Sequence, residues 1–170
     1  MFLRNVQKGA AAVTLGILAG LFFAVAPAQA ASGCDITVVD GAGILGDGTT
    51  QVEEASQKLE SVGADVRIRT LQSFAPAATL DAYIQSQETN CASWQSPDGS
   101  RKSNLVVFAM SMDERSVGIF YGSKWNNAFS GSNSETRIYQ DFMTPQFQGG
   151  DFSQGFVDGI ESHDLGRRRF

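Results

Sequence analysis

Residues Leu105 to Met110, LVVFAM, form a nearly continuous apolar run that follows a polar segment. A strand with one face in water alternates apolar and polar residues, so an uninterrupted run predicts a central strand covered on both faces. Residues 95–103, QSPDGSRKS, carry Pro, Gly, Ser and charges and are expected to form an exposed loop before it. The run therefore requires a sheet with further layers on each side.

The first segments before this run predict a strand and then a helix. Residues 36–39 read as a short strand, and residues 50–62 read as a helix because apolar residues recur on one helical face. Thr50-x-x-Glu53 matches a capping box, which is expected to start that helix.

Residues 64–70 alternate between apolar and polar side chains, which predicts a half-buried strand with Arg67 and Arg69 turned away from the core. A second helix is expected to follow, with Thr79 as its N-cap. A stripe at helical spacing predicts the face that packs on the core: Leu80, Tyr83, Ile84, Gln87, Cys91 and Trp94.

Beyond the central run, residues 113–115 form a tight polar connection and residues 116–121 return as a strand, which predicts a hairpin. The chain then continues in helices. Residues 135–143 are expected to form a helix that stops before Pro145, and Asp151 is expected to cap a last helix.

These elements predict an α/β fold, a three-layer α/β/α sandwich around a small mixed sheet of Rossmann-like type. In such sheets, ligand sites lie in the crevice beyond the strand ends. The loop at Asp40 and the turn at Asp113 are therefore the expected sides of a candidate site.

The first 30 residues have the pattern of an export signal. Two basic residues precede an apolar stretch from Gly9 to Ala26, and the small-residue site Ala28-Gln29-Ala30 follows. Cleavage there would leave no transmembrane helix, whereas an uncleaved stretch is just long enough to serve as an N-terminal membrane anchor. The pattern leaves the compartment open between periplasm, thylakoid lumen and extracellular medium.

Residues 31–165 are expected to form one domain, followed by a short basic tail at residues 166–170. Removing residues 1–30 takes away two of the 13 Lys and Arg residues and none of the 18 Asp and Glu residues, which leaves a formal charge of −7. So acidic a chain is not expected to bind nucleic acid.

Cys34 and Cys91 are the two cysteines, and both lie in the exported part. In an oxidising compartment we expect them to form a disulfide. In the chain-entropy picture, a loop of this size contributes roughly 4 kcal/mol. The bridge would tie the start of the mature chain to a helix.

Residues 38–48, VVDGAGILGDG, place Gly41, Gly43 and Gly46 in the G-x-G-x-x-G spacing of a dinucleotide-binding loop. Asp40, however, would put a carboxylate beside the phosphates, and the best helix-start signal comes after the motif. We therefore expect no nicotinamide or flavin cofactor. The glycines are interpreted as a turn that brings Asp40 to the crevice.

Several segments together resemble the TPM domain family, an extracytoplasmic module. The most specific match is MTPQFQGGDFSQGFVDGI at residues 143–160, and the resemblance spans about residues 36–160. The other matching segments are residues 38–48, residues 104–110 with the turn at 113–115, and residues 117–122.

The resemblance implies a compact α/β/α sandwich, in agreement with the elements above. It also implies low acid-phosphatase activity and divalent-ion binding for some members. For other members it implies maintenance of membrane complexes or receptors. Asp40 and Asp113 match family positions.

The sequence offers few groups for hydrolysis. It has a single histidine, His163, in a polar stretch, and no G-x-S-x-G, C-x-x-C, H-E-x-x-H or D-x-D motif. Carboxylates remain, because Ca²⁺ and Mg²⁺ take several oxygen ligands. We expect Asp40, Asp113 and Asp151 as metal ligands, with Asp40 and Asp113 as the catalytic pair if the protein is a phosphatase. Capping and turn roles are the alternative for each of them.

Three functions follow from these observations. The first is an accessory module that acts on membrane-associated protein complexes in assembly, repair or modulation. The second is a weak acid phosphatase that depends on a divalent metal, which would make the protein an enzyme. The third is a structural calcium-binding domain. The family resemblance and the absence of a conventional catalytic set favour the first.

Overall fold

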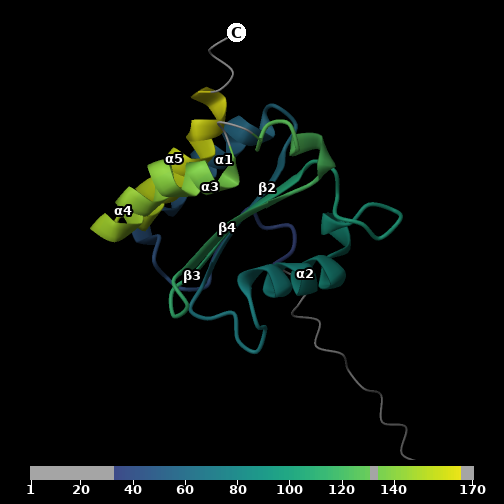
Figure 1. The fold of residues 1–170 in the computed structure, drawn as a ribbon, viewed down its shortest axis with the longest axis horizontal. Coiled ribbons are helices and arrows are strands. Elements are labelled where there is room, and N and C mark those ends of the chain that lie inside the picture. The colour runs from purple at the N-terminus through teal and green to yellow at the C-terminus, as the bar shows by residue number, and fades with distance from the viewer. Residues whose placement is uncertain (1–32, 131–133, 166–170) are drawn as a thin grey trace, which may run out of the picture.

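The computed structural model describes residues 33–130 and 134–165. The expected signal at residues 1–30 and the basic tail at residues 166–170 lie outside the described residues. The described part folds into one four-stranded sheet with helices on both faces (Figure 1). Within these ranges, no helix combines the length and the apolar content of a membrane span.

The sheet has the strand order β1 (Val38–Asp40), β2 (Asp65–Leu71), β3 (Leu105–Ser111) and β4 (Ser116–Tyr121). The first three strands are parallel, and β4 is antiparallel to β3. All residues of β3 are buried, which confirms the central strand predicted from the apolar run. The strand expected at residues 36–39 begins later than predicted, and half of the Ile36 surface is exposed.

Helices cover the sheet in two layers (Figure 1). One face carries α1 (Thr49–Glu60), α3 (Glu135–Ile138), α4 (Thr144–Gly149) and α5 (Phe152–Leu165). The other face carries α2 (Leu80–Asn90). This arrangement is the predicted three-layer sandwich with a mixed sheet.

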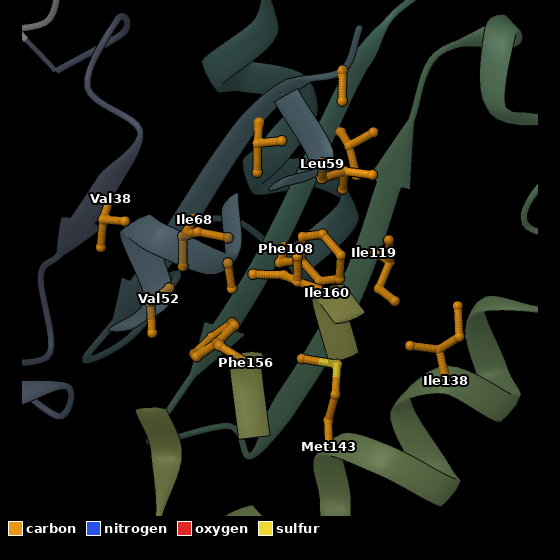
Figure 2. Close-up of a cluster of buried hydrophobic side chains, with 14 of the residues drawn as sticks. Val38, Val52, Leu59, Ile68, Phe108, Ile119, Ile138, Met143, Phe156 and Ile160 are labelled. Carbon is orange, nitrogen blue, oxygen red and sulfur yellow. The ribbon is translucent and has the colours of Figure 1, made fainter. Parts of the chain in front are cut away.

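The larger core lies between the sheet and the layer of α1 and α5 (Figure 2). Ile68 and Phe108 come from the sheet, Val52 from α1, and Phe156 and Ile160 from α5. Each is at most 2% exposed. This layer holds both helices whose N-terminal ends approach the candidate site.

The smaller core lies under α2 and contains the predicted disulfide. Cys34 and Cys91 are bonded, with their Cα atoms 5.5 Å apart. Leu80, Ile84 and Trp94 from the predicted helical stripe are buried beside it. Thr79 caps α2, because its hydroxyl accepts a hydrogen bond from the Ala82 N–H at 3.1 Å. The bridge therefore joins the start of the domain to the end of α2.

Arg67 and Arg69 require a correction, because the structure buries both side chains that the strand pattern turned to solvent. The segment at Gly33 and Cys34 covers this face of β2. Arg67 Nε donates to the Cys34 carbonyl at 2.8 Å, and Arg67 pairs with Asp65 at 2.5 Å. The arginines are buried because backbone carbonyls and a carboxylate satisfy their donors.

Backbone carbonyls and an aromatic ring hold the Arg69 side chain, and no carboxylate of the described residues forms an ion pair with it. Arg69 donates to the Gly33 and Thr37 carbonyls at 3.0 and 3.1 Å and lies over the Trp94 ring at 5.1 Å. Burial, and next the charge of Arg67, lowers the pKa of Arg69 to about 10. The guanidinium therefore stays charged near neutral pH and fastens the N-terminal segment to β2.

The start of α1 also differs from the prediction. Its N-cap is Gly48, no side chain caps it, and Thr50 and Glu53 are exposed residues inside the helix. A capping box needs an extended N-cap residue, whereas a 3-10 turn at Gly46–Gly48 leads directly into α1. The chain is therefore already helical before Thr50.

The helix predicted at residues 135–143 does not stop before Pro145. It passes from α3 through a π-helical turn, Tyr139–Met143, and continues as α4. Pro145 falls in the first turn of α4, directly after the π-helical turn, and the Thr144 N–H before it still donates to the Tyr139 carbonyl. Pro145 therefore lies where the π-helical turn passes into α4, and it does not end the helical segment.

Candidate functional site

The candidate site lies along the sheet edge where β1, β2 and β3 end. These strands are parallel, so their carboxyl ends share that edge. Just after β1 in the sequence, the Gly41 N–H donates to the Thr70 carbonyl at 2.9 Å. Just after β3, the Asp113 N–H donates to the Gln72 carbonyl at 2.9 Å. Asp40 and Asp113 therefore stand on opposite sides of the end of β2.

The Asp40 carboxylate holds the loop that follows β1. Its Oδ1 accepts from the Ile44 N–H at 3.1 Å and from the Thr70 hydroxyl, and its Oδ2 accepts from the Leu45 N–H at 2.9 Å. Burial acts to raise the pKa of Asp40, but the hydrogen bonds from Thr70, Leu45 and Ile44 outweigh it and hold the pKa below its usual value. Asp40 is an anionic cap for this loop.

The glycines of this loop give it the shape that Asp40 holds. Gly43 and Gly46 have φ values of +66° and +50°, in the region that favours glycine. At Gly41, a Cβ would lie 2.8 Å from the Thr70 carbonyl oxygen, so a side chain would separate β1 from β2. The G-x-G-x-x-G spacing thus serves a tight turn, and α1 begins only after it.

Two acidic residues follow β3, and both tie the strand ends together. Asp113 Oδ1 accepts from Gln72 Nε2 at 2.5 Å. Glu114 accepts from the hydroxyls of Ser111 and Ser73, and these bonds lower the pKa of Glu114. Glu114 lies in the same acidic turn as Asp113 but is not among the site residues predicted from the sequence.

Asp151 caps α5, as predicted. Its Oδ1 accepts from the Gln154 N–H at 3.0 Å. In the first turn of α5, the Ser153 hydroxyl donates to the Leu45 carbonyl at 3.1 Å. The N-terminus of α5 therefore packs against the loop that Asp40 holds.

Asp40, Asp113 and Asp151 are each engaged in hydrogen bonds within the chain. Ca²⁺ takes six to eight oxygen ligands, and both oxygens of Asp40 already accept hydrogen bonds. Among the residues that the structure describes, no group of three or more His, Cys, Asp or Glu side chains is arranged to hold a metal ion. Metal binding by Asp40, Asp113 and Asp151 stays a prediction.

His163, the single histidine, lies in α5, but its side chain is outside the described residues.

A second feature, not predicted from the sequence, is a groove of about 320 Å³ along the outer edge of β4. Residues 116–120 of β4 line it. Residues 79–81 at the start of α2 form one wall, and Glu135, Thr136 and Tyr139 form the other. The available signal was weak: residues 116–121 are the last predicted strand and contain no charged residue.

The fold and the disulfide define the class, an α/β/α domain with a mixed sheet and an oxidised cysteine pair. A family model described as the TPM domain matches residues 38–164, from β1 into α5. The chain therefore belongs to the TPM domain family. Family membership and the disulfide together indicate an exported domain.

A solved structure supports the same fold. The chain is similar to the solution NMR structure of the N-terminal domain of a protein from P. gingivalis, with a TM-score of 0.60 and 19% sequence identity. The alignment covers 79% of this chain and 83% of that one. No match was found among curated proteins. At this identity the likeness carries the architecture and nothing about activity.

Proposed function

We propose that this TPM-domain protein is an exported accessory module that binds membrane-associated protein complexes and assists their assembly, repair or modulation. The observation that supports it best is the state of the candidate carboxylates. Asp40 caps a loop, Asp113 binds Gln72, and Asp151 caps a helix. Each one holds the protein's own segments in place.

The lowered pKa of Asp40 argues against a role for it as a general base. A general base works best when its pKa lies near the working pH. The hydrogen bonds that offset burial at Asp40 lower its pKa, so its carboxylate is a weaker base than an ordinary aspartate. A fixed, weakly basic carboxylate suits a rigid loop better than proton transfer.

A pull-down from the native envelope with a tagged mature chain tests this proposal. We expect a reproducible membrane-associated partner, recovered equally by the wild type and by Asp113→Asn, because Asp113 serves the loop rather than a reaction. If repeated experiments with the wild type recover no partner, the proposal is wrong.

The second candidate function is divalent-metal binding through Asp40 and Asp113. It would make the protein either a metal-dependent phosphatase or a structural calcium-binding domain. It is favoured by the position of these carboxylates on one sheet edge and by the exposure of Asp113. A melting temperature raised by millimolar Ca²⁺ or Mg²⁺, and not raised in Asp113→Asn, would support it. Chelator-sensitive hydrolysis of a phosphomonoester would then separate the phosphatase from the structural domain.

A further inference from the structure

The outer edge of β4 presents backbone groups that β3 does not use. In an antiparallel pair, residues alternate between those bonded to the neighbour and those turned away. The Gly122 N–H donates to the Leu105 carbonyl at 2.9 Å, which sets this alternation. The N–H and carbonyl groups of Val117 and Ile119 therefore point away from β3, into the groove.

The sequence and pairing of β4 itself carry none of the usual protection of an exposed edge strand. Proteins shield such edges with charged side chains, prolines, bulges or very short strands. β4 is SVGIFY, without a charge or a proline, and it pairs with β3 without a bulge. The opposite edge strand, β1, has only three residues.

One contact limits the length of the free edge. Arg101 donates to the Tyr121 carbonyl at 3.1 Å and is paired with Glu88 at 2.5 Å. The outward carbonyl of Tyr121 is therefore taken. The part open to an added strand is centred on Val117 and Ile119.

The groove walls are acidic. Asp81 in the first turn of α2 and Glu135 in the first turn of α3 are both exposed, and no Lys or Arg is among the described residues that line the groove. Burial, and next the negative charge of Glu135, raises the pKa of Tyr121, as expected for a carboxylate beside β4. Two full negative charges outweigh the N-termini of two helices, which carry about half a positive charge each at most.

We propose that the free edge of β4 binds an extended, basic peptide segment of a partner protein by β-strand addition. The proposal rests on the proposed function and names the surface through which the module binds. Successive side chains of an added strand point to opposite faces of the sheet. Since α2 and α3 lie on opposite faces (Figure 1), one basic side chain reaches Asp81 and its neighbour in sequence reaches Glu135.

A displayed library of random dodecapeptides, selected on the mature protein, tests the surface directly. We expect enriched peptides to carry Lys or Arg at neighbouring positions. Their affinity, measured by fluorescence anisotropy, should fall at least ten-fold in the double variant Asp81→Asn with Glu135→Gln. The matched control, Asp47→Asn with Glu53→Gln, changes two exposed acids outside the groove and should bind as the wild type does.

The backbone contribution is tested at Val117. Val117→Pro removes an outward N–H and should weaken binding at least ten-fold, whereas Val117→Thr keeps the N–H and the side-chain shape. If Val117→Pro does not fold, the affinity of the double variant Asp81→Asn with Glu135→Gln tests the proposal, because that variant changes exposed side chains only. Failure to enrich peptides, enrichment without basic residues, or equal affinity for the double variant overturns the proposal.

The pull-down separates this proposal from the function on which it rests. Loss of the partner with Asp81→Asn and Glu135→Gln, but not with the control pair, supports the β4 edge as the docking surface. Equal recovery by both pairs overturns the docking surface and leaves the accessory function standing. Recovery of nothing by the wild type contradicts the accessory function itself.

Discussion

A carboxylate and a hydroxyl from different strands organise the loop after β1. Asp40 accepts from Thr70, whose hydroxyl also accepts from the Ala42 N–H at 3.2 Å. The sequence predicted Asp40 at the end of a strand beside a turn. It could not predict Thr70 as the partner, because that contact depends on the parallel register that pairs the two residues.

The first prediction concerns Asp40→Asn. The substitution removes the charge that accepts from Ile44, Leu45 and Thr70, and it should lower the free energy of unfolding by about 2 kcal/mol, as for hydrogen bonds to a charged group. Urea unfolding measures this difference. Asp47→Asn, an exposed acid in the same loop, is the control and should change stability little. Equal stabilities for the two variants would contradict the capping role.

The second prediction is the pH dependence of that difference. The folded pKa of Asp40 is lowered, so its stabilising effect is present above the unfolded pKa of about 3.9 and is lost as pH falls through the folded value. The stability gap between wild type and Asp40→Asn should be constant from about pH 7 to about pH 5 and narrow below about pH 4. A gap that narrows between pH 7 and pH 5 would contradict the lowered pKa.

The helical segment from α3 to α4 packs against α5, and its path could not be predicted from local sequence patterns. The pattern predicted a stop before Pro145, but the π-helical turn carries the chain past it. α5 makes room for this path, because a Cβ at Gly155 would lie 2.3 Å from the Phe147 ring and one at Gly159 would lie 2.6 Å from the Met143 side chain. The path depends on packing between two helices, which local propensity does not contain.

The third prediction compares two helical glycines. Gly155→Ala should lower the free energy of unfolding by about 1–3 kcal/mol through overpacking, despite the better helix propensity of alanine. Gly149→Ala, where an added Cβ meets nothing within 4 Å, should leave stability unchanged or raise it. Urea unfolding of both variants is the measurement. A stabilising Gly155→Ala would show that the two helices are less closely packed.

The sandwich itself was predictable from the sequence, because the apolar run at residues 105–110 and the alternation of strands and helices allow few other arrangements. The burial of Arg67 and Arg69 was not, since it depends on the segment at Cys34 folding over β2. The β4 groove was also unpredictable. It joins residues from α2, β4 and α3 that are far apart in the chain and share no motif.

The fourth prediction concerns the disulfide that holds this segment. Breaking the Cys34–Cys91 bond in Cys34→Ser with Cys91→Ser should lower the free energy of unfolding by about 4 kcal/mol in the chain-entropy picture. Reduction of the wild type should have the same effect, measured by urea unfolding with and without reductant. Unchanged stability after verified reduction would show that the arginine contacts alone hold the segment.

The central claim is that this domain works by binding membrane-associated proteins, and site-specific photocrosslinking in native cells tests it most directly. A crosslinker replaces Thr136, an exposed residue in the groove, or Gln57, an exposed residue on α1. We predict a reproducible crosslink to a membrane-associated protein from position 136 and none from position 57. No membrane-associated product from either position would contradict the central claim, and the same products from both positions would contradict the β4 groove as the docking surface.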